Sequence, residues 1–156
     1  MFYYFTHKNM KTLTYSITIN KPRDFVFKKI MDKSVYSDWN KAWGEGITYE
    51  GEWKEGEYIS FFDKNQGGTK AIIEEFKPNE LIKTKHIAMV NPQNMEVELT
   101  DDMMRKWIGS REEYHFKKDS DDKTTLEVVM ITDEAFEKMM ETWPKALQYF
   151  KEICER

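Results

Sequence analysis

The segment DEAFEKMMETWPKALQYFKEICE, from Asp133 to Glu155 near the end of the 156-residue chain, has the pattern of a long amphipathic helix. Pro144 lies inside this segment and lacks a backbone donor, so we expect a bend or break near residues 140–142. An amphipathic helix of this kind must cover an apolar surface formed elsewhere in the chain. Its large apolar residues recur at helical spacing, with mostly charged or polar residues between them: Phe136, Met139, Met140, Trp143, Leu147, Phe150 and Cys154.

The rest of the chain supplies strands for that helix to cover. Apolar residues at Leu13, Tyr15, Ile17 and Ile19 alternate with polar ones, which is typical of a strand with one buried face. Proline soon after this strand, followed by apolar residues at helical spacing, predicts two short helices before residue 40. Short turns separate most of the remaining strands and predict antiparallel pairing. These strands are expected over residues 47–53, 58–62, 69–76, 81–89, 107–117 and 124–132.

These elements predict an α+β fold. A curved seven-stranded antiparallel sheet carries two short helices after its first strand and the long C-terminal helix on its concave face. The one long connection, residues 90–106, exceeds what a hairpin needs, and we expect a mobile rim with a helical turn at residues 101–105. We expect a single domain over residues 11–156, preceded by an N-terminal extension over residues 1–10.

Composition and charge exclude several classes of protein. The 24 basic and 28 acidic residues give a net charge of -4, so no nucleic-acid partner is expected. No apolar run approaches the ~20 residues that a membrane span needs. Cys154 is the only cysteine, which excludes an intramolecular disulfide and fits a reducing compartment. The first residues lack the pattern of a secretory signal, and we therefore expect a cytoplasmic protein.

The sequence indicates no metal site, no cofactor and no catalytic motif. Asp63, Asn65 and Glu74 have the spacing of calcium ligands in an EF-hand loop. However, Gly67 offers no side-chain donor at the fifth loop position, and the flanking residues alternate as in strands. We interpret this segment as a glycine-rich hairpin turn. Neither a phosphate-binding loop nor a nucleophile elbow is present, so the residues favour a non-enzymatic function over catalysis.

Two of the three histidines lie in expected strands. His86 shares the less charged face of its strand with Thr84, and it has two interpretations. The favoured one is a hydrogen-bonded core histidine, and the other is a polar group that orients a ligand or transfers a proton. His115 is expected on the outer face of its strand, which makes the neighbouring Tyr114 the better candidate to face a cavity.

Three stretches resemble a known superfamily. The run from Asn20-Lys21-Pro22 to Trp39 is similar to the opening of START-like (SRPBCC) helix-grip proteins, whose fold is that of the birch-pollen allergen. The stretch TWPKAL at residues 142–147 is similar to the Gly-Trp-x-x-Ala-Leu of the activator-of-heat-shock-protein-ATPase homologues, with Thr142 in place of glycine. The stretch KPNELI at residues 77–82 resembles that branch's turn between central strands. The resemblance spans residues 11–155 and implies a helix-grip fold, but its motifs are packing residues and leave the function open.

The predicted function is the binding of a small hydrophobic or amphipathic molecule between the C-terminal helix and the sheet. Large apolar side chains with few polar tips converge there, as in most ligand pockets, although the same side chains also suit a solid core. No protein partner is indicated, and catalysis is not evident. The residues expected to contact the ligand are Trp39, Phe62, His86, Tyr114, Met130, Met139, Met140 and Trp143.

Two alternatives stay open. The resemblance implies a protein-interaction module of the heat-shock-protein ATPase activator type, which would use the exterior of the domain. It also implies a cyclase- or hydratase-like enzyme, in which His86 and Tyr114 would be the polar groups of the cavity.

Overall fold

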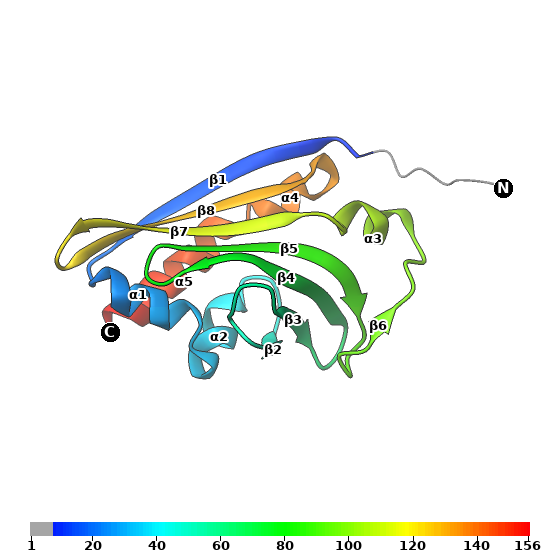
Figure 1. Ribbon diagram of the computed structural model, residues 1–156, viewed down its shortest axis with the longest axis horizontal. Coiled ribbons are helices and arrows are strands. Elements are labelled where there is room, and N and C mark those ends of the chain that lie inside the picture. Colours follow the sequence, from blue (N-terminus) through cyan, green and yellow to red (C-terminus); the bar gives the residue numbers. More distant parts are fainter. Residues whose placement is uncertain (1–7) are drawn as a thin grey trace.

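The structure is a computed structural model that describes residues 8–156 (Figure 1). Most of the expected N-terminal extension, residues 1–7, lies outside the described residues. The first strand already begins at Met10, which pairs with Asp133 at the far end of the chain.

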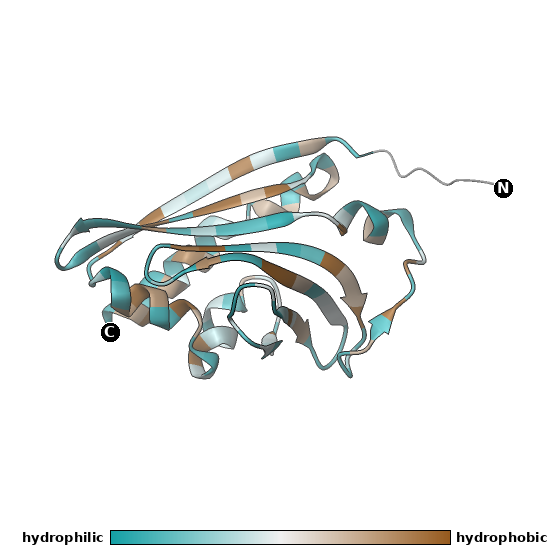
Figure 2. Cartoon of the chain, viewed as in Figure 1, coloured by the Kyte–Doolittle hydropathy of each residue, from teal (hydrophilic) through white to brown (hydrophobic). Residues whose placement is uncertain are grey.

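The strands form the expected curved antiparallel sheet. Seven of them follow the order β1-β8-β7-β5-β4-β3-β2, and an eighth, the two-residue β6, pairs with the end of β5. Residues along the strands alternate between hydrophobic and hydrophilic, as Figure 2 shows, because only one face of the sheet is covered. The strands are β1 (Met10–Ile19), β2 (Thr48–Gly51), β3 (Tyr58–Asp63), β4 (Gly67–Lys77), β5 (Leu81–Val90), β6 (Glu96–Val97), β7 (Arg111–Ser120) and β8 (Lys123–Asp133).

Two short helices follow β1, as predicted. They are α1 (Arg23–Ile30) and α2 (Lys33–Asn40), which begins where the Asp32 side chain accepts a hydrogen bond from the backbone N–H of Ser34. Both supply buried residues to the core beneath the sheet. None of the helices in the described part of the chain is long and apolar enough to cross a membrane.

The expected C-terminal helix is broken at residues 141–142, where the proline argument places the break. A single 3₁₀ turn (Glu134–Phe136) leads into α4 (Glu137–Met140), and α5 runs from Trp143 to Glu155. Pro144 occupies the first turn of α5, where a missing N–H costs nothing. The first helical hydrogen bond after the break runs from the Ala146 N–H to the Thr142 carbonyl, at 3.2 Å. Helix α5 contacts β1 and α2 on the concave side of the sheet (Figure 1).

One expected strand boundary is wrong. The strand predicted over residues 107–117 begins at Arg111, and the residues before it form the short helix α3 (Asp102–Trp107). The Asp101 side chain caps α3 by accepting from the backbone N–H of Met104 at 2.8 Å. Trp107 therefore ends a helix instead of starting a strand. The helical turn expected at residues 101–105 is confirmed, whereas the mobility of this connection stays a prediction.

Candidate functional site

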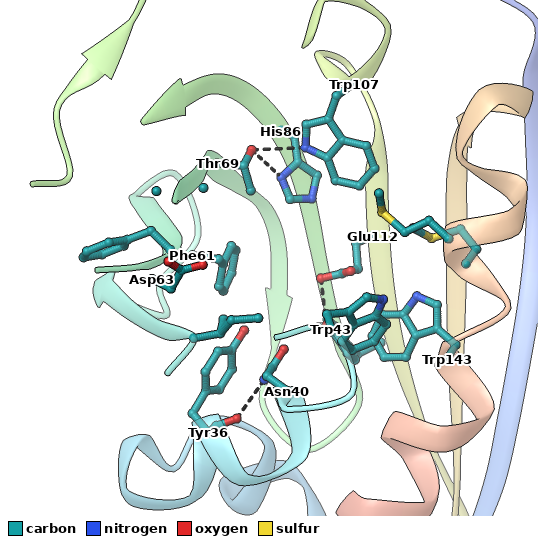
Figure 3. Close-up of a pocket in the computed structure, with 17 residues that line it drawn as sticks. Tyr36, Asn40, Trp43, Phe61, Asp63, Thr69, His86, Trp107, Glu112 and Trp143 are labelled. Carbon is teal, nitrogen blue, oxygen red and sulfur yellow. Dashed lines mark hydrogen bonds between the residues drawn. The ribbon is translucent and has the colours of Figure 1, made fainter. Parts of the chain in front are cut away.

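A cavity of about 240 Å³ lies where the break between α4 and α5 faces the sheet (Figure 3). Strands β3, β4, β5 and β7 form its floor, and residues of α2, α3 and the α4–α5 break complete the wall. Most of the lining is apolar. Its aromatic members are Tyr36, Trp43, Phe61, Phe62, Trp107, Tyr114 and Trp143.

Glycines shape the floor of the cavity at the hairpin between β3 and β4. Gly67 has a φ of +84°, and a Cβ there would stand 2.3 Å from the Val90 carbonyl oxygen. A Cβ on Gly68 would stand 2.0 Å from the Phe61 carbonyl oxygen. The carboxylate of Asp63 accepts hydrogen bonds from the backbone N–H groups of Asn65 and Gln66 in the turn, at 2.8 and 2.6 Å. The hairpin interpretation of this EF-hand-like segment is therefore confirmed.

The structure brings six of the eight predicted contact residues to the cavity: Phe62, His86, Tyr114, Met139, Met140 and Trp143. The other two do not line it. Trp39 is 1% exposed and packs against Trp143 and Phe150, with ring centroids at 6.3 and 5.9 Å. Met130 is also 1% exposed and lies on β8, the strand beyond the cavity floor. Both fill the core next to the cavity.

Met139 and Met140, next to the break between α4 and α5, differ in their exposure to solvent. Met140 is buried, whereas Met139 is half exposed although both line the same space. The expectation of a continuous inner stripe on the C-terminal helix is thus wrong at Met139. Helix α4 ends at Met140, and Met139 forms part of the rim of the cavity instead of the core.

Glu112 lines the cavity, although it was not among the predicted contact residues. It alternates with Tyr114 and Phe116 along β7, so the same period-2 argument that placed Tyr114 inward would have placed Glu112 inward too. The Tyr114 hydroxyl donates to the Glu112 carboxylate at 2.7 Å. Burial raises the pKa of Glu112 to about 7, although that hydrogen bond works in the opposite direction. Both protonation states of Glu112 are therefore populated near neutral pH.

His86 forms the second polar group of the cavity. Its Nδ1 lies 3.1 Å from the Thr69 hydroxyl, which also contacts the Ala88 carbonyl and the Trp107 indole N–H, each at 3.2 Å. The hydroxyl has one proton and gives it to Ala88, so the arrangement that satisfies all three contacts has Nδ1–H as the donor to Thr69. The Nε2 atom is then an acceptor, and it has no partner among the described residues.

The environment of His86 also fixes its charge. The imidazole is buried beside Trp107, with ring centroids 4.8 Å apart, and burial lowers its pKa to about 4. His86 is consequently neutral at physiological pH. The inward orientation expected from the strand pattern is confirmed.

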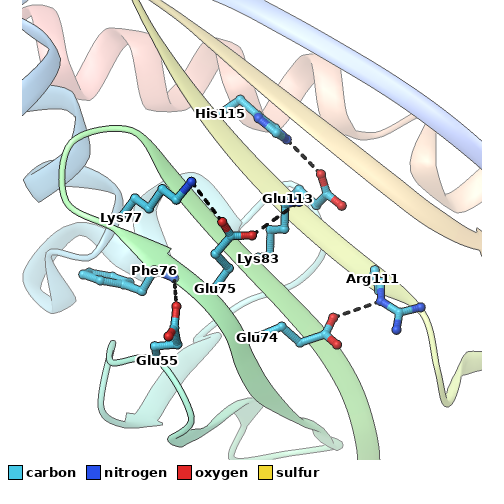
Figure 4. Close-up of polar contacts among 9 residues, drawn as sticks. All are labelled: Glu55, Glu74, Glu75, Phe76, Lys77, Lys83, Arg111, Glu113 and His115. Atoms are coloured by element: carbon cyan, nitrogen blue, oxygen red, sulfur yellow. Dashed lines mark hydrogen bonds and ion pairs between the residues drawn. The ribbon is translucent and has the colours of Figure 1, made fainter.

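The opposite face of the sheet carries charged pairs (Figure 4). His115 Nε2 lies 2.8 Å from a Glu113 carboxylate oxygen, as expected for a histidine on the outer face. Glu75 pairs with Lys77 and Lys83 at 3.2 and 3.5 Å. The outer face is therefore a network of compensated charge, whereas the inner face holds Glu112 without a basic partner in the cavity lining.

The comparisons with known proteins concern the fold. No protein-family model and no curated protein sequence matches this sequence. Among solved structures, protein MLL2253 from Mesorhizobium loti superposes with a TM-score of 0.73 at 10% identity, over 94% of this chain and 98% of that one. The Aha1 dimer from Colwellia psychrerythraea gives a TM-score of 0.67 at 16% identity, over 93% and 96% of the two chains. The chain has the same helix-grip fold as these structures.

A further helix-grip structure is an enzyme by its name. The Zhui aromatase/cyclase from Streptomyces sp. R1128 superposes with a TM-score of 0.65 at 13% identity, over 95% of each chain. At these identities the likeness establishes the architecture and carries no activity from one helix-grip protein to another. The assignment to the activator-of-heat-shock-protein-ATPase branch stays a prediction.

Proposed function

We propose that this helix-grip protein binds a small hydrophobic or amphipathic molecule in the cavity between the α4–α5 break and the sheet. The observation that carries the proposal is the cavity itself, about 240 Å³ of space walled by aromatic and methionine side chains. Only a few polar groups interrupt the apolar wall, chiefly Glu112, Tyr114 and His86. Ligand pockets generally combine an apolar wall with a small number of orienting polar groups.

The apolar wall supports modest affinity without any covalent chemistry. Burying about 300 Å² of apolar ligand surface contributes on the order of 7 kcal/mol at ~25 cal/mol per Å². Loss of translational and conformational freedom offsets several kcal/mol of that gain. Dissociation constants from micromolar to millimolar are therefore expected.

A ligand screen tests the proposal. Small aromatic and aliphatic molecules with varied head groups are screened by thermal shift and native mass spectrometry, and at least one class is expected to bind in a 1:1 ratio. Met139→Trp places a large ring at the rim and is expected to weaken binding about tenfold or more. Lys138→Trp adds the same ring on the neighbouring residue, outside the lining, and is the matched control.

The screen also has a result that would reject the proposal. If no class of molecule binds the wild-type protein, or if both tryptophan variants weaken binding equally, the cavity is not the binding site. The exterior-interaction function would then take precedence.

One observation favours a second function, proton-transfer catalysis. A partly buried carboxyl group with a pKa of about 7 in a cavity is suited to general acid–base chemistry at neutral pH. If this alternative holds, the wild-type protein is expected to convert a bound molecule chemically. The Glu112→Gln variant is expected to bind the same molecule without converting it. Recovery of the molecule unchanged from the wild-type protein, by mass spectrometry, would leave binding as the function.

A further inference from the structure

Within the described residues, the cavity is lined by acidic side chains and by no lysine or arginine. The ionisable side chains that line it are Tyr36, Asp63, His86, Glu112 and Tyr114, and no lysine or arginine is among the lining residues. His86 is neutral because of its burial. The cavity therefore offers carboxylates and no cation, although the whole chain has 24 basic residues.

The wall around Glu112 is made of aromatic rings. Trp43 and Trp143 meet edge to face with ring centroids 4.6 Å apart, and Trp143 also lies edge to face with Tyr114, the hydrogen-bond donor to Glu112, at 6.1 Å. On the other side of the cavity, Tyr36 and Phe61 stack at 6.1 Å. The faces of such rings are electron-rich and attract organic cations.

The unpartnered acceptor on His86 points to the same chemistry. Figure 3 shows His86, Phe61 and Glu112 around one space. Nε2 of His86 is buried without a partner among the described residues, and it is an acceptor in the arrangement derived above. A ligand that donates hydrogen bonds would satisfy both this nitrogen and the Glu112 carboxylate.

We propose that the cavity selects small aromatic or aliphatic molecules that carry a protonated amine, with the ammonium group at Glu112 and the hydrocarbon body against Trp43 and Trp143. The inference rests on the proposed function and names the ligand class. An ammonium group supplies the opposite charge that the partly buried Glu112 carboxylate lacks among the lining residues. A ligand carboxylate would instead place two like charges in a desolvated space, and the cavity rejects it.

Three indole compounds with different head groups test the charge preference. Tryptamine carries an ammonium group, tryptophol a hydroxyl group and indole-3-acetate a carboxylate on the same aromatic body. Calorimetric titrations at pH 8 are expected to show tryptamine binding about tenfold or more tighter than tryptophol, because a hydrogen bond to a charged partner is stronger than a neutral one. Indole-3-acetate is expected to bind more weakly than tryptophol.

Two neighbouring variants separate the cavity from general electrostatics. Glu112→Gln keeps the shape of the side chain and an acceptor for Tyr114, and it is expected to reduce the preference for tryptamine over tryptophol to about twofold or less. Glu113→Gln removes the same charge from the outer face of the same strand and is expected to retain the wild-type preference. Thermal unfolding confirms that both variants are folded.

The outcomes distinguish this inference from the proposed function. Equal affinities for the three compounds, a preference for indole-3-acetate, or an amine preference that persists in Glu112→Gln would overturn the inference and leave a binding cavity in place. Absence of binding by all three compounds would also overturn it. The broader ligand screen decides separately whether the proposed function stands.

Discussion

Strand β7 carries two similar pairs of residues on its two faces. Glu112 accepts a hydrogen bond from the Tyr114 hydroxyl at 2.7 Å on the inner face (Figure 3), and Glu113 contacts His115 at 2.8 Å on the outer face (Figure 4). The two glutamates are consecutive in sequence and each contacts the residue two positions later. Their surroundings differ, because the inner pair faces a mostly apolar cavity and the outer pair faces a network of charges.

The two faces differ in whether a carboxylate has a basic partner. On the outer face, Arg111 pairs with Glu74 at 2.9 Å, and Glu75 has two lysine partners. On the inner face, the Thr84 hydroxyl donates to the Glu112 backbone carbonyl at 3.0 Å. Within residues 8–156, the Tyr114 hydroxyl is the one hydrogen-bond partner of the Glu112 carboxylate. A partly buried ionisable group without an opposite charge beside it marks a candidate functional site.

The largest expected effect is on stability when an inner residue of β7 loses its side chain. Phe116→Ala is expected to lower the free energy of unfolding by about 3–5 kcal/mol, because its buried ring packs edge to face on Phe27. Lys117→Ala, on the exposed face, is expected to cost less than about 1 kcal/mol despite its ion pair with Glu127. Chemical denaturation measures both, and similar losses would contradict the assignment of the two faces.

The next largest effect is a pH dependence of the free energy of unfolding, and it is caused by Glu112. Because the pKa of Glu112 is raised from 4.5 to about 7 on folding, its contribution to stability is present below pH 4.5 and lost as the pH rises to 7. The wild-type protein is therefore expected to lose up to about 3 kcal/mol relative to Glu112→Gln across this range.

Two controls isolate this effect in denaturation at several pH values. His86 has the opposite slope, since its lowered pKa makes stability fall as the pH drops from 6.5 to 4, but it is present in both proteins and cancels in the difference. Glu113→Gln keeps the Glu112 carboxyl and is expected to retain the loss. A constant difference between wild type and Glu112→Gln would show that Glu112 is not desolvated.

A smaller effect is expected when the tyrosine partner of the inner pair is changed. Tyr114→Phe removes the donor to Glu112 and is expected to cost about 1.5 kcal/mol at pH 8, where the carboxylate is ionised, and less at pH 5. His115→Gln, in the partly exposed outer pair, is expected to cost under about 1 kcal/mol. A cost for Tyr114→Phe that does not increase with pH would mean that its hydroxyl does not stabilise the carboxylate.

Local patterns were enough to predict the architecture. The alternation in β1 and the helical spacing after residue 133 are properties of short segments, and the break near residue 141 follows from the missing donor of Pro144. The start of β7 was misplaced because apolar residues near Trp107 suit either a strand or a helix. The Asp101 cap favours the helix. In the helical conformation, the Trp107 indole N–H donates to the Thr69 hydroxyl.

Periodic patterns in the sequence assign most side chains to the buried or the exposed face of their element, but the folded structure alone shows which of the inward side chains line an empty space. Trp39 and Met130 satisfy the same patterns as Trp143 and Tyr114, yet neighbouring side chains enclose the first two while the second two line a cavity. A periodic pattern specifies the face of an element, because that depends only on local backbone geometry. The volume between a helix and a curved sheet depends on the distance between them. That distance is set by the packing of the whole domain, and no local pattern in the sequence specifies it.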